Sequence, residues 1–521
     1  MNLFDYLELD GLRASECQKW MMVDGCRQLS GCEIYQKIFS VGKYLMDAGY
    51  YRQPIAVIAG HNVDTVLCFL GILASGNHYI PLDPNIKPER LEKIRRMTGF
   101  RLLLVCGQQD GGFLAGSIEK EEAAVTCLPF EEVQVNLMAG DIEKLAERRC
   151  RLSADEPAYF IFTSGSTGEP KGIIKTHENM VSFLDAYICE FGFRQSDRLG
   201  TQTPFYFDAS AKDIYLAFKR KCQLYILEEK WFVRPLQLAE YMKKERITVI
   251  QWVPSALSML SRFRVFEQIS LPDLRMVLFV GEVFPVSQLR VWMEMVPDAE
   301  YINLYGASEI AGICAYCRIQ GLEDGQDAVP IGYALKNCEI YLIDGGKLIT
   351  KPYQTGELYV KSRAVAAGYL LKVGKSVSGE MQEVFINRPL PQLPQGSYYR
   401  SGDLAYYGRK GELFFSARKD SQVKHMGHRI ELGEITSAAQ AMEQVQNSCC
   451  VYENQKLILF YEGSCGKAEL ARFLKAKLAP YQIPNKLVKL ETWPLNANGK
   501  TDQIKLKKLA AAGHKAKRAA K

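Results

Sequence analysis

Long apolar runs are missing from the sequence. The longest apolar stretches, such as residues 66–74, are far shorter than the ~20 residues that a helix needs to cross a bilayer. The first residues, MNLFDYLELDG, are acidic and show neither the basic start nor the apolar run of a secretory signal. We therefore expect a cytoplasmic protein without a membrane span.

An excess of charge of one sign is also missing from most of the chain. The formal net charge is +6, but seven of the 65 basic residues lie in residues 504–521, which contain no acid, and this leaves 58 basic against 59 acidic residues. The balance argues against a nucleic-acid-binding face, and no nucleic-acid partner is expected. The basic tail is expected to be a solvated, frayed end, with docking to a carrier or a surface as the alternative.

The cysteines lack the spacing of a disulfide framework. Their number, 15, is odd, so we expect reduced and mostly buried thiols. Cys314 and Cys317 have the spacing of a redox or metal pair, but no second pair or histidine cluster completes a zinc site. Structural packing is the favoured interpretation.

With 521 residues, the chain is too long for one hydrophobic core, so two or more domains are expected. The first half alternates β-rich runs with amphipathic helical stretches, which is typical of parallel sheets covered on both faces. Strands are expected at 54–60, 100–106, 247–254 and 275–282, with a helix near 62–76. After about residue 330, strand-turn-strand patterns predict a smaller antiparallel element, and residues 420–503 predict a compact α+β domain.

The strongest chemical signal is YFIFTSGSTGEPKG, residues 159–172. A β run leads into glycines and hydroxyl residues, which bring backbone N–H and O–H donors close to an anion, and a lysine adds positive charge. The segment therefore predicts a phosphate-binding loop, although its spacing differs from the Walker pattern. A flexible surface loop is the alternative. The candidate residues are Thr163, Ser164, Gly165, Ser166, Thr167, Gly168 and Lys171.

This loop resembles the signature of the acyl-adenylate-forming superfamily, which includes acyl-CoA synthetases, luciferases and peptide-synthetase adenylation domains. Further segments match that family's motifs in order: FDAS (207–210), NLYGASE (303–309), GELYV (356–360), YRSGDL (399–404), ARKDSQVKHMGHRIELGEI (417–435) and NANGKTD (496–502). The resemblance covers about residues 30–503. It implies an α/β fold with a large N-terminal domain (1–419) of layered sheets and helices, including a small β-rich subdomain. A small C-terminal α+β domain (420–503), joined by a hinge, and the basic tail (504–521) complete it.

The resemblance also implies a reaction. A carboxylate attacks the α-phosphate of ATP and expels pyrophosphate, so positioning and preorganised cations should dominate catalysis. Glu309 would hold Mg²⁺, and Lys500 would contact the substrate carboxylate and the charge developing at phosphorus. The alternatives are a helix N-terminal acid for Glu309 and a solvated charge for Lys500.

The nucleotide-binding residues that the resemblance implies fall into three groups. The adenine would be faced by Gly281, Glu282 and Asn303 and stacked by Tyr305 and Phe415, with Gly306 in the same motif. Ser308 would lie near the α-phosphate, whereas Asp403 would accept from both ribose hydroxyls with support from Arg418. For Asp403, a turn residue after Gly402 is the alternative.

A second step follows in this family, because the small domain rotates and a phosphopantetheine thiol then reaches the adenylate. Asp420 matches the hinge position, and Gly427 lies in the face expected to line the thiol tunnel. The chain contains no carrier domain or condensation domain. We therefore expect it to deliver the acyl group to a separate carrier protein, as D-alanine–carrier ligases do.

Asp208 indicates which acid is activated. In peptide-synthetase adenylation domains the aspartate of this motif pairs with the substrate α-ammonium, so the resemblance predicts an amino acid. A helix N-cap is the alternative role for Asp208. The remaining pocket positions that the resemblance implies are Ala209, Lys212, Gln251, Leu278, Val280, Leu304, Gly312 and Ile313.

Two of these pocket positions are polar, Lys212 and Gln251. A lysine directed into a closed pocket needs an anion, which motivates the hypothesis of an acidic or hydrogen-bonding substrate side chain. The alternative is that Lys212 extends to solvent.

Departures from the family pattern loosen the assignment to one subfamily. Ala307 and Ser308 replace the usual Pro-Thr, and Ala417 replaces a usual Gly. The sequence thus predicts a ligase that adenylates an amino acid with ATP and Mg²⁺ and loads a carrier's phosphopantetheine. An acyl-CoA synthetase acting on a small carboxylic acid is the alternative, and a non-catalytic nucleotide-binding protein is a third possibility.

Overall fold

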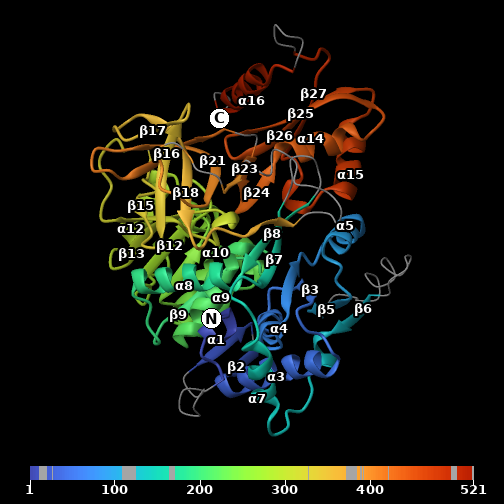
Figure 1. Cartoon of the computed structure of the whole chain (residues 1–521). Coiled ribbons are helices and arrows are strands. Elements are labelled where there is room, and N and C mark those ends of the chain that lie inside the picture. Colours follow the sequence, from blue (N-terminus) through green and yellow to red (C-terminus); the bar gives the residue numbers. More distant parts are fainter. Residues whose placement is uncertain are drawn as a thin grey trace. The chain divides into compact units, whose positions relative to one another are not determined.

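The computed structural model describes residues 1–10, 20–25, 27–107, 125–163, 170–326, 328–370, 384–387, 390, 392–419, 422–494 and 501–518, the last seven by their backbone alone (Figure 1). The chain divides into two compact units. The larger unit contains Met1–Pro84, Ile94–Ile161 and Gly172–Ala417, and the smaller unit contains Asn85–Lys93, Phe162–Lys171 and Arg418–Lys521.

The first sheet of the larger unit has a parallel centre. Its strand order is β15-β14-β13-β12-β11-β9-β10-β1-β2, and the pairs from β13 through to β1 are parallel. The strands are β1 (Met21–Asp24), β2 (Arg27–Ser30), β9 (Arg198–Thr201), β10 (Gln223–Ile226), β11 (Val249–Trp252), β12 (Met276–Val280), β13 (Glu300–Tyr305), β14 (Ala315–Ile319) and β15 (Tyr333–Ala334). Every residue of β11 and β12 is buried, as expected for central strands that helices cover on both faces.

The second sheet has the order β19-β8-β7-β4-β3-β5-β6. Its strands are β3 (Pro54–Ala59), β4 (His78–Leu82), β5 (Leu102–Cys106), β6 (Thr126–Pro129), β7 (Pro157–Thr163), β8 (Lys171–Thr176) and β19 (Gly368–Leu370). Helix α4 (Val63–Ala74) is buried along its whole length, which explains its nearly continuous apolar sequence. Helix α3 (Gly31–Asp47) packs beside α4 and begins with a capping box formed by Ser30 and Glu33.

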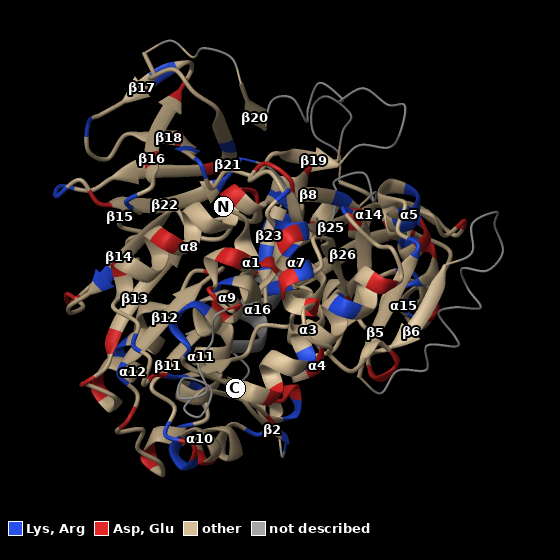
Figure 2. Cartoon of the chain, turned by 60° about the horizontal axis from the view of Figure 1, so that its bottom comes forward, with Lys and Arg blue, Asp and Glu red and all other residues tan. Residues whose placement is uncertain are grey.

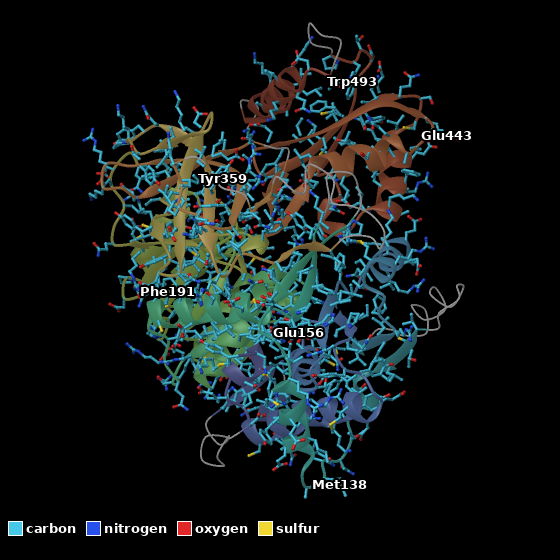
Figure 3. The ribbon with its side chains drawn as sticks, viewed as in Figure 1. Met138, Glu156, Phe191, Tyr359, Glu443 and Trp493 are labelled. Atoms are coloured by element: carbon cyan, nitrogen blue, oxygen red, sulfur yellow. The ribbon has the colours of Figure 1, made fainter. Side chains whose placement is uncertain are left out.

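The other helices of the larger unit connect or cover these strands. They are α1 (Leu3–Tyr6), α7 (Asp141–Arg149), α8 (His177–Phe191), α9 (Ala211–Arg220), α10 (Pro235–Lys244), α11 (Pro254–Arg262) and α12 (Val286–Met295), whereas α5 (Pro88–Thr98) crosses the boundary between the units. Figure 3 marks Phe191 at the end of α8.

The third sheet is antiparallel and begins after residue 337, close to the point where the sequence pattern changes. Its order is β17-β16-β18-β21-β20, with β22 paired to β21. The strands are β16 (Cys338–Asp344), β17 (Lys347–Ile349), β18 (Thr355–Ser362), β20 (Phe385–Ile386), β21 (Tyr398–Tyr407) and β22 (Leu413–Arg418). Figure 3 marks Tyr359 on β18.

In its described residues, the smaller unit combines two small sheets with three α-helices that lie entirely within it. Its elements are β23 (Gln422–His425), β24 (His428–Glu431), α14 (Leu432–Gln440), β25 (Val445–Glu453), β26 (Lys456–Gly463), α15 (Lys467–Lys477), β27 (Lys486–Lys489) and α16 (Gln503–Arg518). Ile430, Ile435, Leu457 and Leu459 are among its core residues. The predicted α/β fold, with a small antiparallel part and a small α+β part, is confirmed.

The basic tail differs from its interpretation as a frayed end. Residues 503–518 form α16, and Leu506 and Ala510 are buried with Trp493 against β25 and β26. The apolar residues of one helix face anchor the start of the tail, while the lysines between them stay exposed. Outside the tail, Lys and Arg are interspersed with Asp and Glu on helices and strands (Figure 2).

Two expectations about the whole chain can be compared with the described residues. Among them, no helix is long and apolar enough to cross a membrane. None of the cysteines that the structure describes forms a disulfide, and most are buried. Among the described residues, no group of three or more histidines, cysteines and acids is arranged to hold a metal ion.

Candidate functional site

The predicted site residues of the larger unit gather where the parallel strands end. Asp208 follows β9, Gln251 lies in β11, Gly281 follows β12, and Tyr305 ends β13. The carboxyl ends of neighbouring parallel strands meet at one edge of a sheet, which is where ligands bind in open α/β sheets. Strand order therefore brings together residues that are far apart in the sequence.

Four predicted pocket residues share one face of this sheet: Gln251, Leu278, Val280 and Leu304. We call them the wall residues. Gln251 pairs in register with Leu278, and Val280 pairs with Leu304. Leu278 and Val280 are two residues apart on β12, so their side chains point to the same face. Gly312 and Ile313 follow β13 in the turn before β14, and Ala209 lies in the short 3-10 helix Asp208–Ser210 before α9.

Asp208 has two partners inside the protein. Its Oδ1 accepts a hydrogen bond of 2.8 Å from the Tyr159 hydroxyl, and its Oδ2 lies 3.1 Å from Nζ of Lys175. Lys175 also donates to the backbone carbonyl of Ser308. The N-cap residue of α9 is Ser210, so the helix N-cap alternative does not describe Asp208.

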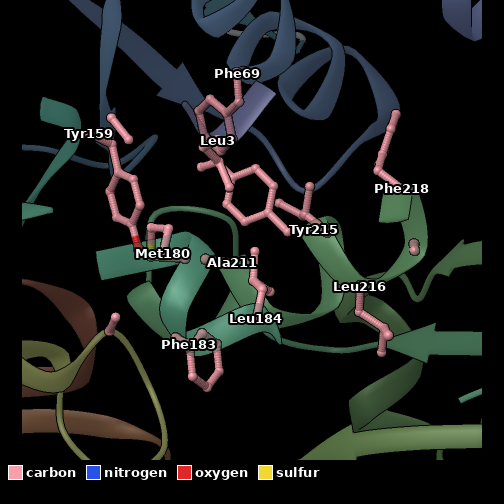
Figure 4. Close-up of a cluster of buried hydrophobic side chains, with 14 of the residues drawn as sticks. Leu3, Phe69, Tyr159, Met180, Phe183, Leu184, Ala211, Tyr215, Leu216 and Phe218 are labelled. Carbon is pink, nitrogen blue, oxygen red and sulfur yellow. Dashed lines mark hydrogen bonds between the residues drawn. The ribbon is translucent and has the colours of Figure 1, made fainter. Parts of the chain in front are cut away.

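Tyr159 is held by a stack of aromatic rings. Tyr79 stacks on Phe69 at 4.2 Å between ring centroids and on Tyr159 at 4.9 Å. The Tyr159 hydroxyl also lies 3.2 Å from Sδ of Met180, and Figure 4 shows these two residues together in the core. The stack fixes the position of the hydroxyl that donates to Asp208.

The sequence analysis missed Lys175. It lies in β8, is completely buried, and forms an ion pair with Asp208. Burial lowers the pKa of its ammonium, while the neighbouring Asp208 opposes this shift. The available signal was weak: Lys175 directly follows the apolar pair Ile173-Ile174, and a buried charge needs a partner.

Glu309 lies in the short 3-10 helix Ser308–Ile310 and is almost completely buried. Its carboxylate accepts hydrogen bonds from the hydroxyls of Tyr369, at 2.8 Å, and Tyr399, at 3.3 Å. Mg²⁺ prefers carboxylate oxygens and often binds one or two of them together with substrate phosphates. The chemistry of the Glu309 carboxylate fits this role, and the two tyrosine hydroxyls hold its side chain in place.

Asp403 lies inside β21 and is only 4% exposed, so the turn alternative does not describe it. Its Oδ2 accepts a hydrogen bond from the Tyr305 hydroxyl, and its backbone N–H donates to Oγ of Ser401 at 3.0 Å. Burial, with the negative Asp403 beside it, raises the pKa of Tyr305 well above its usual value. Tyr305 therefore stays a hydrogen-bond donor to Asp403.

The remaining nucleotide candidates have local contacts. The side-chain amide of Asn303 donates to the Pro330 carbonyl at 2.8 Å, and Glu282 accepts from the backbone N–H of Ser255 at 3.0 Å. Gly281 has φ of +100°, a conformation that favours glycine. Phe415, in β22, packs against the main core.

Gly306 has a structural requirement of its own. A Cβ at this position would lie 1.8 Å from the Gly312 carbonyl oxygen and 2.8 Å from Cα of Ile313. Only glycine permits this approach of the two backbone segments. The approach fixes the turn that carries Ser308 and Glu309.

Lys212 is buried, not extended to solvent. Its Nζ lies 2.9 Å from Oδ1 of Asp213 and 3.0 Å from the Ala209 carbonyl oxygen. Asp213 also accepts from the Thr201 hydroxyl at 2.7 Å. The anion that Lys212 needs is therefore its sequence neighbour, and this contact removes the reason for requiring an acidic substrate side chain.

Gln251 has one satisfied end and one unsatisfied end. Its Oε1 accepts from the Tyr187 hydroxyl, whereas its buried Nε2 has no hydrogen-bond partner among the described residues. A buried polar group without a partner costs free energy unless a ligand or water supplies one. Gln251 is therefore suited to bind an acceptor atom of a ligand.

Several predicted residues cannot be compared with this geometry. The glycine- and hydroxyl-rich residues Ser164, Gly165, Ser166, Thr167 and Gly168, together with Asp420 and Lys500, lie outside the described residues. Thr163 ends β7 and Lys171 begins β8, so the two flank the predicted loop. Arg418 and Gly427 belong to the smaller unit, where Gly427, with φ of +80°, forms the tight turn between β23 and β24.

The family described as "AMP-binding enzyme" matches residues 13–370. The chain belongs to this family. It is 29% identical over 472 residues to a D-alanine–D-alanyl carrier protein ligase of Bacillus cytotoxicus, covering 87% of the chain and 88% of that relative. It is 30% identical over 499 residues to bacitracin synthase 1 of Bacillus licheniformis, covering 92% of the chain but only 9% of that relative.

Among solved structures, the chain resembles the adenylation domain AlmE of Vibrio cholerae in complex with glycyl-adenosine-5'-phosphate. The TM-score is 0.80 at 21% identity, with 97% of each chain covered, so this likeness concerns the fold. As an AMP-binding enzyme related to carrier-protein ligases and peptide-synthetase adenylation domains, the chain is an acyl-adenylate-forming ligase. Enzymes of this family use ATP and Mg²⁺.

Proposed function

We propose that the chain joins a small carboxylic acid to AMP, releasing pyrophosphate, and then transfers the acyl group to the phosphopantetheine thiol of a separate carrier protein. Two hydrogen bonds between the same two segments support the adenylation step most directly. Tyr305 donates to Asp403, and Tyr399 donates to Glu309. They connect the end of β13 and the turn after it with β21, so the predicted ribose acceptor and the predicted Mg²⁺ ligand lie in one part of the larger unit.

Each of these residues has a defined task in the proposed reaction. Asp403 accepts hydrogen bonds from the ribose, and Tyr305 orients its carboxylate. Mg²⁺, when bound, offsets negative charge on the phosphates, and Glu309 would hold it. Lys500 would add positive charge at the reacting phosphorus and the substrate carboxylate, as the resemblance implies.

The relatives support a carrier protein as the acceptor. The carrier protein ligase of Bacillus cytotoxicus spans nearly the same length as this chain and acts, by its name, on a carrier protein. This supports a carrier thiol over coenzyme A. Because the chain spans only 9% of bacitracin synthase 1, that relative supports the adenylation step alone.

Two candidates remain for the acid. An amino acid is supported by the name of the D-alanine ligase relative and by the position of Asp208 in its motif. An acid without an ammonium group is favoured by one observation, the ion pair between Asp208 and Lys175.

ATP–pyrophosphate exchange tests the adenylation step. The purified chain should exchange pyrophosphate with at least one acid from a panel of amino acids, their D-forms and small carboxylic acids. The same acid should then load a holo-carrier protein but not coenzyme A. Exchange with no acid would disprove the proposal, and loading of coenzyme A alone would identify an acyl-CoA synthetase.

A further inference from the structure

The acid site of the larger unit already contains a buried cation. Lys175 is completely buried, and its Nζ lies 3.1 Å from Oδ2 of Asp208, whose side chain is 6% exposed. The other oxygen of Asp208 accepts from Tyr159 at 2.8 Å. Both carboxylate oxygens thus have a donor within the protein, and one donor carries the compensating charge.

A substrate α-ammonium would introduce a second cation at this carboxylate. Two ammonium groups would share one negative charge in a buried site, where uncompensated charge is costly. Glu309 also acts electrostatically on Lys175. Its charge is committed to Mg²⁺ in the proposed reaction, so it does not compensate a further ammonium.

Lys175 has little freedom to leave Asp208. It lies on β8, and its second acceptor is the backbone carbonyl of Ser308, in the turn that carries Glu309. Moving its ammonium elsewhere would break both contacts and leave Asp208 without its cation, which costs more than losing an exposed ion pair.

Resting on the proposed adenylation, we propose that Lys175 takes the place of a substrate α-ammonium at Asp208, so that the acid activated by this enzyme carries no ammonium group next to its carboxyl. An ammonium has three N–H donors. The described residues provide Lys175 with two acceptors, Asp208 and Ser308, and the third donor is available for an oxygen of the substrate. A 2-hydroxy or 2-oxo acid matches this arrangement best.

The test compares acids that differ only at the carbon next to the carboxyl. ATP–pyrophosphate exchange is measured for matched sets: an α-amino acid, the 2-hydroxy acid, the 2-oxo acid and the unsubstituted acid with the same side chain. In the wild type, kcat/KM for the best acid without nitrogen should exceed that of its α-amino partner at least about tenfold. A higher kcat/KM for the α-amino acid overturns the inference and leaves the proposed adenylation standing.

Variants then identify the residue responsible. Lys175→Met leaves Asp208 free to pair with a substrate cation, so the ratio of kcat/KM values should shift toward the α-amino acid by about tenfold or more. Adding Asp208→Asn to Lys175→Met should cancel that shift. An unchanged ratio in Lys175→Met overturns the role of Lys175, provided that its thermal unfolding remains cooperative.

Lys219→Met is a matched control. Lys219 also contacts one carboxylate and one carbonyl, 2.9 Å from Oε1 of Glu8 and 2.7 Å from the Tyr6 carbonyl oxygen, but lies outside the site. Its loss should leave the acid preference unchanged. If Lys175→Met does not fold, the wild-type comparison still decides the inference. Exchange with no acid at all would instead disprove the proposed adenylation, and the inference with it.

Discussion

Replacing Gly306 with alanine tests whether the turn after β13 positions the reacting groups. The added Cβ would lie 1.8 Å from the Gly312 carbonyl oxygen, and real Cβ contacts are not shorter than 3.0 Å, so the segments must separate by roughly 1.2 Å. The obstructing atoms are backbone, which cannot rotate away as a flexible side chain can. The separation would therefore displace the turn that holds Ser308 and Glu309.

The expected size of the effect follows from this displacement. Misplacing reacting groups by about 1 Å can reduce a rate by about 100-fold. We expect Gly306→Ala to lower kcat/KM in ATP–pyrophosphate exchange by about that factor. Overpacking should also lower the free energy of unfolding by about 1–3 kcal/mol.

Gly321→Ala is the control, because a Cβ there meets nothing within 4 Å. Exchange kinetics and urea unfolding are measured for both variants. The reasoning is refuted if Gly306→Ala retains at least about a third of the wild-type kcat/KM, or if Gly321→Ala loses as much as Gly306→Ala.

Three further predictions concern single charged residues. Lys500→Ala should lower the adenylation rate by about 10²–10³ but affect thioester formation from supplied acyl-AMP much less, and equal losses in both half-reactions would contradict its role. Glu309→Gln should raise the Mg²⁺ concentration needed for half-maximal exchange by about tenfold or more, whereas an unchanged Mg²⁺ dependence would exclude Glu309 as a ligand. Asp213→Asn leaves Lys212 without its anion and should lower the free energy of unfolding by about 3–5 kcal/mol in urea titrations. A loss below about 1 kcal/mol would mean that Lys212 finds other compensation.

The sequence predicted the strands well because buried strands are short and nearly continuous in apolar residues. Residues 54–60 correspond to β3 (Pro54–Ala59), and residues 275–282 contain β12 (Met276–Val280). The order of the strands in the sheet was not predicted from the sequence. It places β9 between β10 and β11, a neighbour relation that depends on long-range pairing and not on local pattern.

The wall residues show what family resemblance can supply. These residues are separated in sequence, and no local pattern marks them as neighbours: Gln251, Leu278, Val280 and Leu304. The resemblance grouped them, and the strand register accounts for the grouping physically. Their role in binding the acid stays a prediction.

The sequence did not predict which residues pair with the buried charges. For Lys212, the sequence left two alternatives open, an anion of the substrate or extension to solvent. The structure shows neither, because the partner is the next residue, Asp213, and sequence does not reveal which way a helical side chain turns. Lys175 was overlooked because its partner, Asp208, is distant in sequence. A charged residue in an apolar strand is a sequence signal for an internal partner, but β8 gives this signal only weakly, because its sequence KGIIKT also contains Lys171 and Thr176.

Lys175 and Lys212 together define the electrostatics of the proposed acid site. Lys175 is compensated by Asp208 and Lys212 by Asp213, so neither ion pair leaves a charge for the substrate to balance. When the charges of a site are paired within the protein, binding a substrate ammonium costs free energy. Such a site also gains nothing from a carboxylate on the substrate side chain. Nε2 of Gln251, which has no partner among the residues that the structure describes, could then distinguish substrate side chains by donating to a neutral oxygen. The acid expected from this arrangement is a monocarboxylate whose only charge is the group that attacks ATP.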